Sequence, residues 1–151
     1  MKRVIITGAT GMIGITLIEH LLKKDIKILV LIRKNSKRKS ILPFHENLKI
    51  LECDLNELCN LNLEEKNYDT FYHLAWDGTF GESRNDLYLQ NLNIKYTLDA
   101  LDLAKRMGCK TFIGAGSQAE YGRVNGIISN NTIANPENGY GIAKLVARRK
   151  E

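Results

Sequence analysis

The stretch "RVIITGATGMIG", residues 3–14, decides the fold class of this chain. A short run rich in β-branched residues is followed by Gly8, Gly11 and Gly14. At a junction between a strand and a helix, glycines with this spacing permit a tight turn and let the backbone approach a ligand closely. The N–H groups at the start of the following helix attract anions. Glycines also mark ordinary turns, so the meaning of this stretch depends on the elements around it.

Strand and helix patterns alternate outward from this stretch. Apolar residues predict strands at 4–7, 26–32, 48–53, 70–75 and 111–115, and helical spacing predicts helices at 13–22, 86–107 and 140–150. Gly108 stands where it can close the long helix, and segment 116–138 is rich in Gly, Asn and Ser, as loops are. Repeated β-α-β units of this size predict the α/β class, with a Rossmann-type doubly wound parallel sheet.

Composition restricts the class of protein further. With 151 residues, of which 44% are hydrophobic, the chain is expected to form one domain over residues 1–151. No apolar run approaches the ~20 residues of a membrane span, so we expect no membrane partner. Cys53, Cys59 and Cys109 are odd in number and lack metal-type spacing. They predict reduced thiols in a cytoplasmic protein, and no metal site.

The net charge of +5 makes nucleic acid a partner to consider. Most of the excess lies in two runs, which are Arg33, Lys34, Lys37, Arg38 and Lys39, and Arg148, Arg149 and Lys150. A solvated helix end explains the second run, because cations suit the helix dipole there. For the first run, RNA or phosphate binding is the weaker alternative, and we expect no nucleic-acid partner.

Six motifs resemble those of the extended short-chain dehydrogenase/reductases, in the NAD-dependent epimerase/dehydratase family, whose members act largely on nucleotide sugars. They are "TGATGMIG", "ECDLNE", "FYHLAW", "NLNIKYTLDAL", "GSQAEYG" and "YGIAK". Because they occur in the family's order and cover nearly all of the chain, the resemblance is specific.

The resemblance implies a set of cofactor-binding residues. Asp54 is expected to hydrogen-bond the adenine amino group with Leu55 beside it, and Leu74 and Ala75 are expected to lie along the cofactor. The whole implied set is Gly8, Gly11, Met12, Ile13, Gly14, Arg33, Asp54, Leu55, Leu74, Ala75, Asn93, Tyr140 and Lys144.

The resemblance also implies Ser117, Tyr140 and Lys144 as catalytic residues. A tyrosine is a poor base at neutral pH unless nearby positive charge stabilises its anion. Lys144 lies four residues after Tyr140, which places both on one face of a helix. Tyr140 is then expected to exchange a proton with a sugar hydroxyl while hydride moves, and Ser117 to hydrogen-bond the reacting oxygen. A solvated helix face is the alternative for a Tyr-Lys pair considered alone.

The end of the second predicted strand bears on the choice of cofactor. An acidic residue there indicates NAD, whereas arginine accommodates the 2′-phosphate of NADP. The chain has Arg33 there and no acidic residue nearby. We therefore expect NADP, with NAD as the second choice.

The resemblance implies hydride transfer at a nucleotide-sugar carbon, as 4-keto reduction or 4-epimerisation. The family's 4,6-dehydratases carry an acidic pair after the catalytic hydroxyl residue, whereas this chain has Gln118 and Ala119. Family members continue well beyond "YGIAK", so the fold is expected to be truncated before a C-terminal substrate lobe. The alternative function is therefore an inert dinucleotide-binding module. We expect a homodimer, with a nucleotide sugar as the substrate of the complete enzyme.

Three further residues have an expected role or an unexpected identity. Trp76 follows the fourth predicted strand and either lines the nicotinamide or sugar site or packs structurally. His73 lies within an apolar strand and is expected to be a core histidine. Gly139 stands where the family often has proline before its tyrosine.

Overall fold

The structure of the chain is a computed structural model that describes residues 1–148. Residues 149–151 lie outside the described residues, and with them Arg149 and Lys150 of the second basic run. The chain divides into two compact units, one of residues 1–75 with 99–115 and one of residues 76–98 with the segment from 116 onward. The single domain expected over residues 1–151 therefore stays a prediction.

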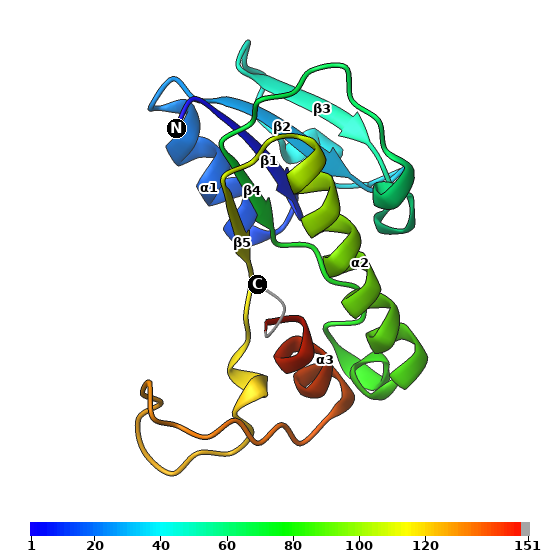
Figure 1. The fold of residues 1–151 in the computed structure, drawn as a ribbon, viewed down its shortest axis with the longest axis vertical. Helices are drawn as coiled ribbons and strands as arrows, with labels where there is room; N and C mark the ends of the chain where they lie inside the picture. The colour runs from blue at the N-terminus through cyan, green and yellow to red at the C-terminus, as the bar shows by residue number, and fades with distance from the viewer. Residues whose placement is uncertain (149–151) are drawn as a thin grey trace. The chain divides into compact units, whose positions relative to one another are not determined.

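The first unit contains a five-stranded parallel sheet. Its strands are β1 (Arg3–Thr7), β2 (Lys27–Ile32), β3 (Leu48–Glu52), β4 (Thr70–His73) and β5 (Thr111–Gly114), in the order β3-β2-β1-β4-β5 (Figure 1). Helix α1 (Met12–Leu22) connects β1 to β2. The chain moves from β1 outward to β3 and returns to the other side of β1 at β4, so the strand order reverses between β1 and β4. This order confirms the predicted Rossmann-type sheet.

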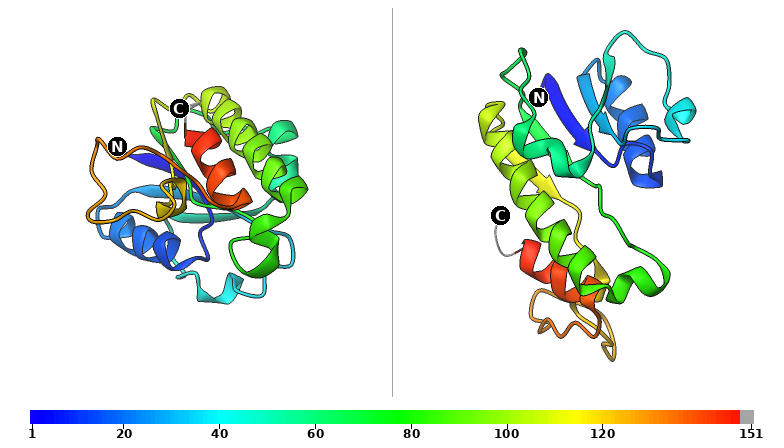
Figure 2. Two further views of the ribbon diagram at one scale, coloured as in Figure 1. Left: turned by 90° about the horizontal axis from the view of Figure 1, so that it is seen from below. Right: turned by 90° about the vertical axis from the view of Figure 1, so that its right-hand side faces the viewer.

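The remaining elements of residues 1–148 are two helices and four short 3₁₀ turns. They are α2 (Leu87–Arg106), α3 (Gly139–Arg148), η1 (Lys39–Ile41), η2 (Leu55–Asn60), η3 (Gly81–Asn85) and η4 (Gln118–Glu120). Helix α2 begins in the second unit and ends in the first. Within the second unit, α3 lies beside the first half of α2 (Figure 2).

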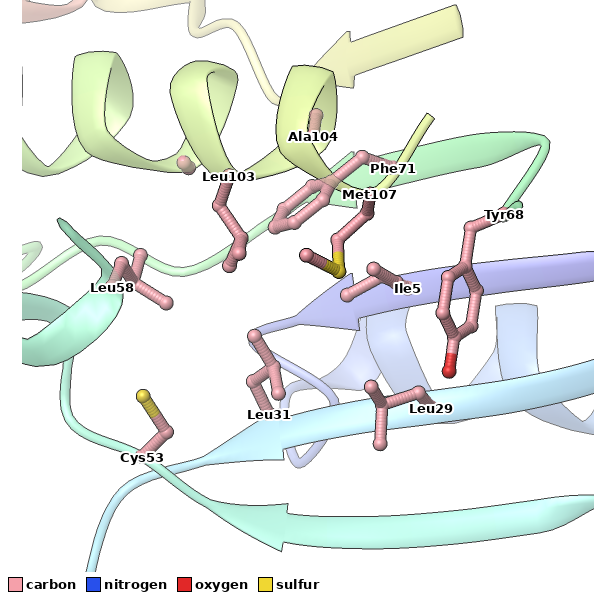
Figure 3. Close-up of a cluster of buried hydrophobic side chains, with 11 residues drawn as sticks. Ile5, Leu29, Leu31, Cys53, Leu58, Tyr68, Phe71, Leu103, Ala104 and Met107 are labelled. Carbon is pink, nitrogen blue, oxygen red and sulfur yellow. The ribbon is translucent and has the colours of Figure 1, made fainter. Parts of the chain in front are cut away.

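The central strands are buried on both faces, which explains their continuous apolar runs. One cluster joins them to η2 and the end of α2, and it contains Ile5, Leu29, Leu31, Leu58, Phe71, Leu103 and Met107 (Figure 3). The other cluster joins them to α1, and it contains Val4, Ile6, Ile18, Leu21, Ile28 and Val30. Alternate residues of one strand thus face opposite helices, as the two-residue period of a strand requires.

The end of α2 matches the predicted stop at Gly108. Gly108 has φ +77°, and its N–H donates to the carbonyl of Lys105 at 3.0 Å. The N–H of Cys109 donates to the carbonyl of Ala104 at 2.9 Å. These two bonds form a Schellman motif, which satisfies carbonyls that the end of the helix leaves without partners.

Two predicted segments differ from the structure. The strand expected at 70–75 ends at His73, because Leu74 and Ala75 pack against the turn at Gly8. The loop expected at 116–138 contains η4, whose first N–H groups are satisfied in part by Ser117. A single turn is too short to show an apolar period, so hydrophobic patterning did not predict it.

Two structural properties of residues 1–148 bear on function. No helix there is long and apolar enough to cross a membrane. Nor do these residues contain a group of three or more His, Cys, Asp or Glu side chains that could hold a metal ion.

Candidate functional site

The turn after β1 brings its backbone into contact with the segment after β4. Gly8 has φ +72°, and a Cβ there would lie 2.6 Å from the backbone nitrogen of Ala75. A Cβ at Gly14 would lie 2.4 Å from the carbonyl oxygen of Gly8. Any larger residue at Gly8 or Gly14 would force the backbone apart, whereas a Cβ at Gly11 would meet only that same oxygen, at 3.3 Å. The sequence motif therefore works mainly through Gly8 and Gly14.

The first turn of α1 is open to solvent. Gly11 is the N-cap and has no side-chain capping bond, and the first turn contains no acidic residue. Met12 and Ile13 are 81% and 65% exposed. The N–H groups of this turn have no partner within the helix, and the helix dipole makes them a favourable site for an anion. These residues fit the pyrophosphate of a dinucleotide.

The segments that follow β2 and β3 are joined through Asp54. Oδ1 of Asp54 accepts the backbone N–H of Lys34 at 3.0 Å. The ammonium of Lys34 forms an ion pair with Glu57, which raises the pKa of Lys34 and lowers that of Glu57. Leu55 is half-buried at the start of η2, and Arg33 is exposed. Asp54 and Arg33 thus lie at the carboxyl ends of adjacent strands, where ligands of parallel sheets bind.

His73 and Thr7 join the ends of β4 and β1. His73 is 4% exposed, and its Nδ1 lies 2.9 Å from Oγ1 of Thr7. The N–H of Ala75 donates to the same hydroxyl at 3.4 Å. His73 is therefore a core histidine, as its position in an apolar strand predicts.

In the second unit, two buried amides hold the segment that follows Ala75. Gln90 accepts the indole N–H of Trp76 at 2.9 Å and donates to the carbonyls of Gly78 and Ser83, each at 2.9 Å. Asn93 accepts the N–H of Asp77 at 2.9 Å, and its own amide donates to the carbonyl of Asp77 at 2.9 Å. Asn93 also donates to the carbonyl of Leu89. Both donors of Asn93 are used, so its direct contact with a cofactor stays a prediction.

Tyr140 and Lys144 lie on α3 in contact with Trp76. The rings of Trp76 and Tyr140 meet edge to face, with centroids 5.9 Å apart. Nζ of Lys144 lies 3.8 Å from the Trp76 ring centroid and 5.9 Å from that of Tyr140. Lys144 is only 6% exposed. Because a buried ammonium is costly unless it is compensated, this lysine is not part of a solvated helix face.

Ser117 is the N-cap of η4. Its Oγ accepts the N–H of Ala119 at 3.2 Å, which leaves the hydroxyl hydrogen available for another acceptor. The N–H of Ser117 donates to Glu120 at 2.6 Å. A Cβ at Gly141 would lie 2.3 Å from the carbonyl oxygen of Ala119, so the glycine allows η4 to pack against α3. Ser117 and Tyr140 thus stand on two elements that touch within the same unit.

Two residues of the second unit were missed by sequence reasoning. Glu120 is 1% exposed, and Oε2 lies 3.2 Å from the guanidinium of Arg148, a contact without hydrogen-bond geometry. The spacing of Ser117 and Glu120 is that of a capping box, a signal that could have found Glu120. Arg84 lies over the ring of Tyr140, with its guanidinium carbon 4.5 Å from the centroid. No sequence motif indicates Arg84, because this contact depends on how η3 folds.

The fold is of the Rossmann type, and an open helix N-terminus lies at the point where the strand order reverses, which is where proteins of this class bind dinucleotides. The profile of the NAD-dependent epimerase/dehydratase family matches residues 4–149. The chain belongs to this family, which confirms the resemblance seen in the six motifs.

Individual relatives are sugar-modifying enzymes. The chain is 32% identical over 97% of its length to the NAD(+)-dependent dTDP-6-deoxy-L-talose 4-dehydrogenase of Aggregatibacter actinomycetemcomitans. The UDP-Glc/GlcNAc 4-epimerase of Campylobacter jejuni is 26% identical with a TM-score of 0.84 over 99% of this chain. MoeE5, solved with UDP-glucuronic acid and NAD, is 27% identical with a TM-score of 0.80 over 97% of this chain.

This chain spans about half the length of these relatives, namely 53% of the dehydrogenase, 48% of the epimerase and 47% of MoeE5. The names of the dehydrogenase and of the MoeE5 complex specify NAD. The NADP preference predicted from Arg33 therefore has no support from them.

Proposed function

We propose that this chain is the dinucleotide-binding part of a nucleotide-sugar oxidoreductase or epimerase. In this proposal, hydride transfer at C4 of the sugar is assisted by Ser117, Tyr140 and Lys144. The observation that carries it is the burial of Lys144 beside Trp76 and Tyr140, at 6% exposure. This burial places a positive charge near the phenol whose proton transfer the proposal requires.

The proton chemistry follows from the types of these three side chains. In this proposal the phenol of Tyr140 exchanges the proton with the sugar oxygen, and Lys144 supplies a positive charge near its ring, with Nζ 5.9 Å from the ring centroid. Ser117 accepts one hydrogen bond from the backbone and keeps its own hydrogen for the reacting sugar oxygen. When bound, a nicotinamide accepts or returns hydride at the sugar carbon. Trp76 supplies an apolar wall beside Tyr140.

We propose NAD as the cofactor. An arginine after β2 would suit a 2′-phosphate, but the neighbouring cation, Lys34, is already paired with Glu57. Asp54 adds negative charge at the same edge and would repel a 2′-phosphate. The relatives whose names specify a cofactor specify NAD. Arg33 can instead stack on the adenine, which NAD and NADP share.

Elimination of water from the sugar is the less favoured reaction. Gln118 donates to the carbonyl of Gly122 at 2.8 Å, and Ala119 is buried. Glu120 accepts the N–H of Ser117 and lies against Arg148, so both of its carboxylate oxygens contact groups of the protein itself. Reduction or oxidation at C4, and epimerisation at C4, need only the proton transfer described above. The names of the related 4-dehydrogenase and 4-epimerase support both reactions.

The cofactor is tested by calorimetric titration of the chain with NAD⁺ and NADP⁺ in parallel. We expect tighter binding of NAD⁺, and we expect Gly14→Ala to abolish binding of both dinucleotides while circular dichroism shows a folded chain. Arg33→Ala should weaken both to a similar degree, and Lys24→Ala, which removes a distant charge of the same sign, should weaken neither. If NADP⁺ binds more tightly and Arg33→Ala removes the difference, the NAD assignment is wrong.

The reaction is tested by incubation with NAD⁺ and dTDP-6-deoxy-L-talose or a UDP-sugar. A 4-dehydrogenase produces NADH in proportion to oxidised sugar, whereas a 4-epimerase produces the C4 epimer with no net NADH. With either activity, Tyr140→Phe should lower turnover by about 10²–10⁴-fold, the usual size of a general acid–base contribution.

The second candidate function is a dinucleotide-binding module without turnover. It requires only the glycine turn after β1 and the open first turn of α1. NAD⁺ binding without conversion of any sugar would establish it for this chain.

We also propose a cytoplasmic homodimer. The cysteines are free thiols, as reducing compartments favour. On α2, Tyr88 and Leu92 are 89% and 43% exposed, and on α3, Ile142 and Val146 are 49% and 39% exposed. Each pair is spaced by four residues and so occupies one helical face. Exposed apolar faces of this kind commonly mark contacts with another protein, and we assign them to a second copy of the chain.

A further inference from the structure

Arg84 is held against Tyr140 by a cation–π contact. The guanidinium carbon lies 4.5 Å from the centroid of the Tyr140 ring. Nη1 of Arg84 donates to the carbonyl of Thr79 at 3.2 Å, which fixes the direction of the side chain. Within residues 1–148, no carboxylate forms an ion pair with Arg84. The positive charge beside the phenol is therefore not neutralised.

The turn that carries Arg84 packs against the start of α3. The N–H of Gly139 donates to Oδ1 of Asn85 at 3.3 Å. A Cβ at Gly139 would lie 3.1 Å from the carbonyl oxygen of Arg84 and 3.0 Å from Cδ2 of Leu87. These contacts are tighter than side chains normally make, so glycine permits the approach of η3 to α3.

Gly139 is an unusual residue for its position. Asn138 caps α3, because its Oδ1 accepts the N–H of Gly141 at 2.8 Å. Gly139 is therefore the first helical residue, the position that most favours proline. A proline has no N–H for Asn85 and places ring atoms where Gly139 has none. The chain thus lacks proline at the first helical position and has there a glycine that allows η3, which carries Arg84, to approach α3.

We propose that Arg84 is a positioning residue for Tyr140, and that Gly139 and Asn85 hold it in place. The inference rests on the proposed function, in which Tyr140 transfers the proton. A planar guanidinium over one face of the ring restricts rotation of the ring, while Trp76 meets it edge to face. Arg84 acts through Tyr140 and need not touch the substrate.

The position of the Tyr140 ring can be measured in the chain without any ligand. Trp76 is the chain's one tryptophan, and its ring centroid lies 5.9 Å from that of Tyr140. The emission spectrum and lifetime of Trp76 therefore report on this contact. We expect Arg84→Met to change both, and Gly139→Pro to produce the same change, with α3 intact by circular dichroism. Arg123→Met, which alters an exposed arginine of the same unit, should change neither.

The double variant tests whether Gly139 acts through Arg84. If it does, Arg84→Met combined with Gly139→Pro should give no larger change in emission than either substitution alone. Additive changes, or an emission in Arg84→Met equal to that of the wild type, would overturn the inference. If Arg84→Met does not fold, Gly139→Pro alone decides the same question, because proline suits the first position of a helix.

Measurement of turnover distinguishes a positioning role from a purely structural one, because a purely structural residue should leave kcat unchanged. We expect Arg84→Met to lower kcat by about 10-fold, the factor that corresponds to a partly desolvated cation–π contact, with KM unchanged. Arg84→Lys should restore part of kcat, because it keeps the charge and loses the planar contact. A rise in KM at constant kcat would overturn the positioning role. If the wild type has no turnover, the proposed function fails, and the emission of Trp76 still tests the placement of Tyr140.

Discussion

The three glycines after β1 are not equivalent residues. A Cβ at Gly8 would lie within 2.6 Å of two backbone atoms, and one at Gly14 within 2.4 Å of a carbonyl oxygen. Gly11 has φ −78° and ψ 165°, values open to any residue, and its nearest obstacle is 3.3 Å away. The spacing in the sequence does not distinguish the three glycines, whereas in the structure only Gly8 and Gly14 lie where a side chain would collide with other backbone atoms.

This difference predicts unequal effects of the same substitution. Gly14→Ala should destabilise the chain by about 1–3 kcal/mol, the usual cost of overpacking, because the added methyl group meets rigid backbone. Gly11→Ala is the matched control from the same turn and should cost less than about 1 kcal/mol. Urea unfolding followed by circular dichroism measures both values. Equal losses of unfolding free energy would show that the backbone near Gly14 relaxes freely.

The three cysteines also differ as individual residues. Burial is the main cause that raises the pKa of the Cys53 thiol to about 11 and that of Cys109 to about 11. Cys59 is exposed. Because the thiolate is the reactive form, a raised pKa leaves very little of it near neutral pH, and the reactive fraction grows as the pH rises toward the pKa.

We therefore predict that one thiol reacts fast with a thiol reagent and that the other two react slowly. At pH 8, a thiol reagent such as dithionitrobenzoate should react with Cys59 at least about 10-fold faster than with Cys53 or Cys109. Cys59→Ser should remove the fast phase and leave the slow ones. Two fast phases in the folded wild type would contradict the burial of Cys53 or Cys109.

At the scale of elements, the end of α2 was predicted at Gly108 and the start of α3 was predicted within one residue of Gly139. Gly108 follows an apolar-periodic run and adopts the left-handed conformation that such a stop requires. The hydrogen bond between the first residue of α3 and Asn85, which lies 54 residues away from Gly139 in sequence, was not predictable from local spacing. The short turns η2, η3 and η4 were not predicted for a different reason, because they depend on local hydrogen bonds, which give the sequence no periodic pattern.

The stop at Gly108 predicts a stability effect that arises from backbone conformation alone. A Cβ at Gly108 would meet its nearest atom at 3.7 Å, an ordinary contact, but φ is +77°. Gly108→Ala should therefore lower the free energy of unfolding by about 1 kcal/mol. Gly108→Asn should lower it less, because asparagine tolerates this region better. Denaturant unfolding of the two variants compares them, and an alanine variant as stable as the asparagine variant would argue against this reason.

At the scale of the whole molecule, the exposed faces of α2 and α3 predict the oligomeric state. In light scattering after size exclusion, the chain should have twice its monomer mass, and Leu92→Glu and Ile142→Glu should each give a monomer, because a buried unpaired carboxylate is costly. Ile127→Glu is the control, since Ile127 is 93% exposed outside both helices. A wild type that stays monomeric at every concentration, or a control that dissociates equally, would rule out this interface.

The sequence by itself determined the fold class and the glycine turn after β1. Strands buried on both faces need continuous apolar runs, and a tight turn beside the start of a helix needs glycine. Both patterns lie within short stretches of sequence and can therefore be recognised without the structure. Tyr140 and Lys144 could also be placed on one helical face, because they are four residues apart. Only the tertiary structure decided the burial of Lys144 against Trp76, the hydrogen bonds of Asn93 with Asp77 and the contact of Arg84 with Tyr140. These features join residues from separate elements, and local sequence spacing carries no information about which distant atoms meet.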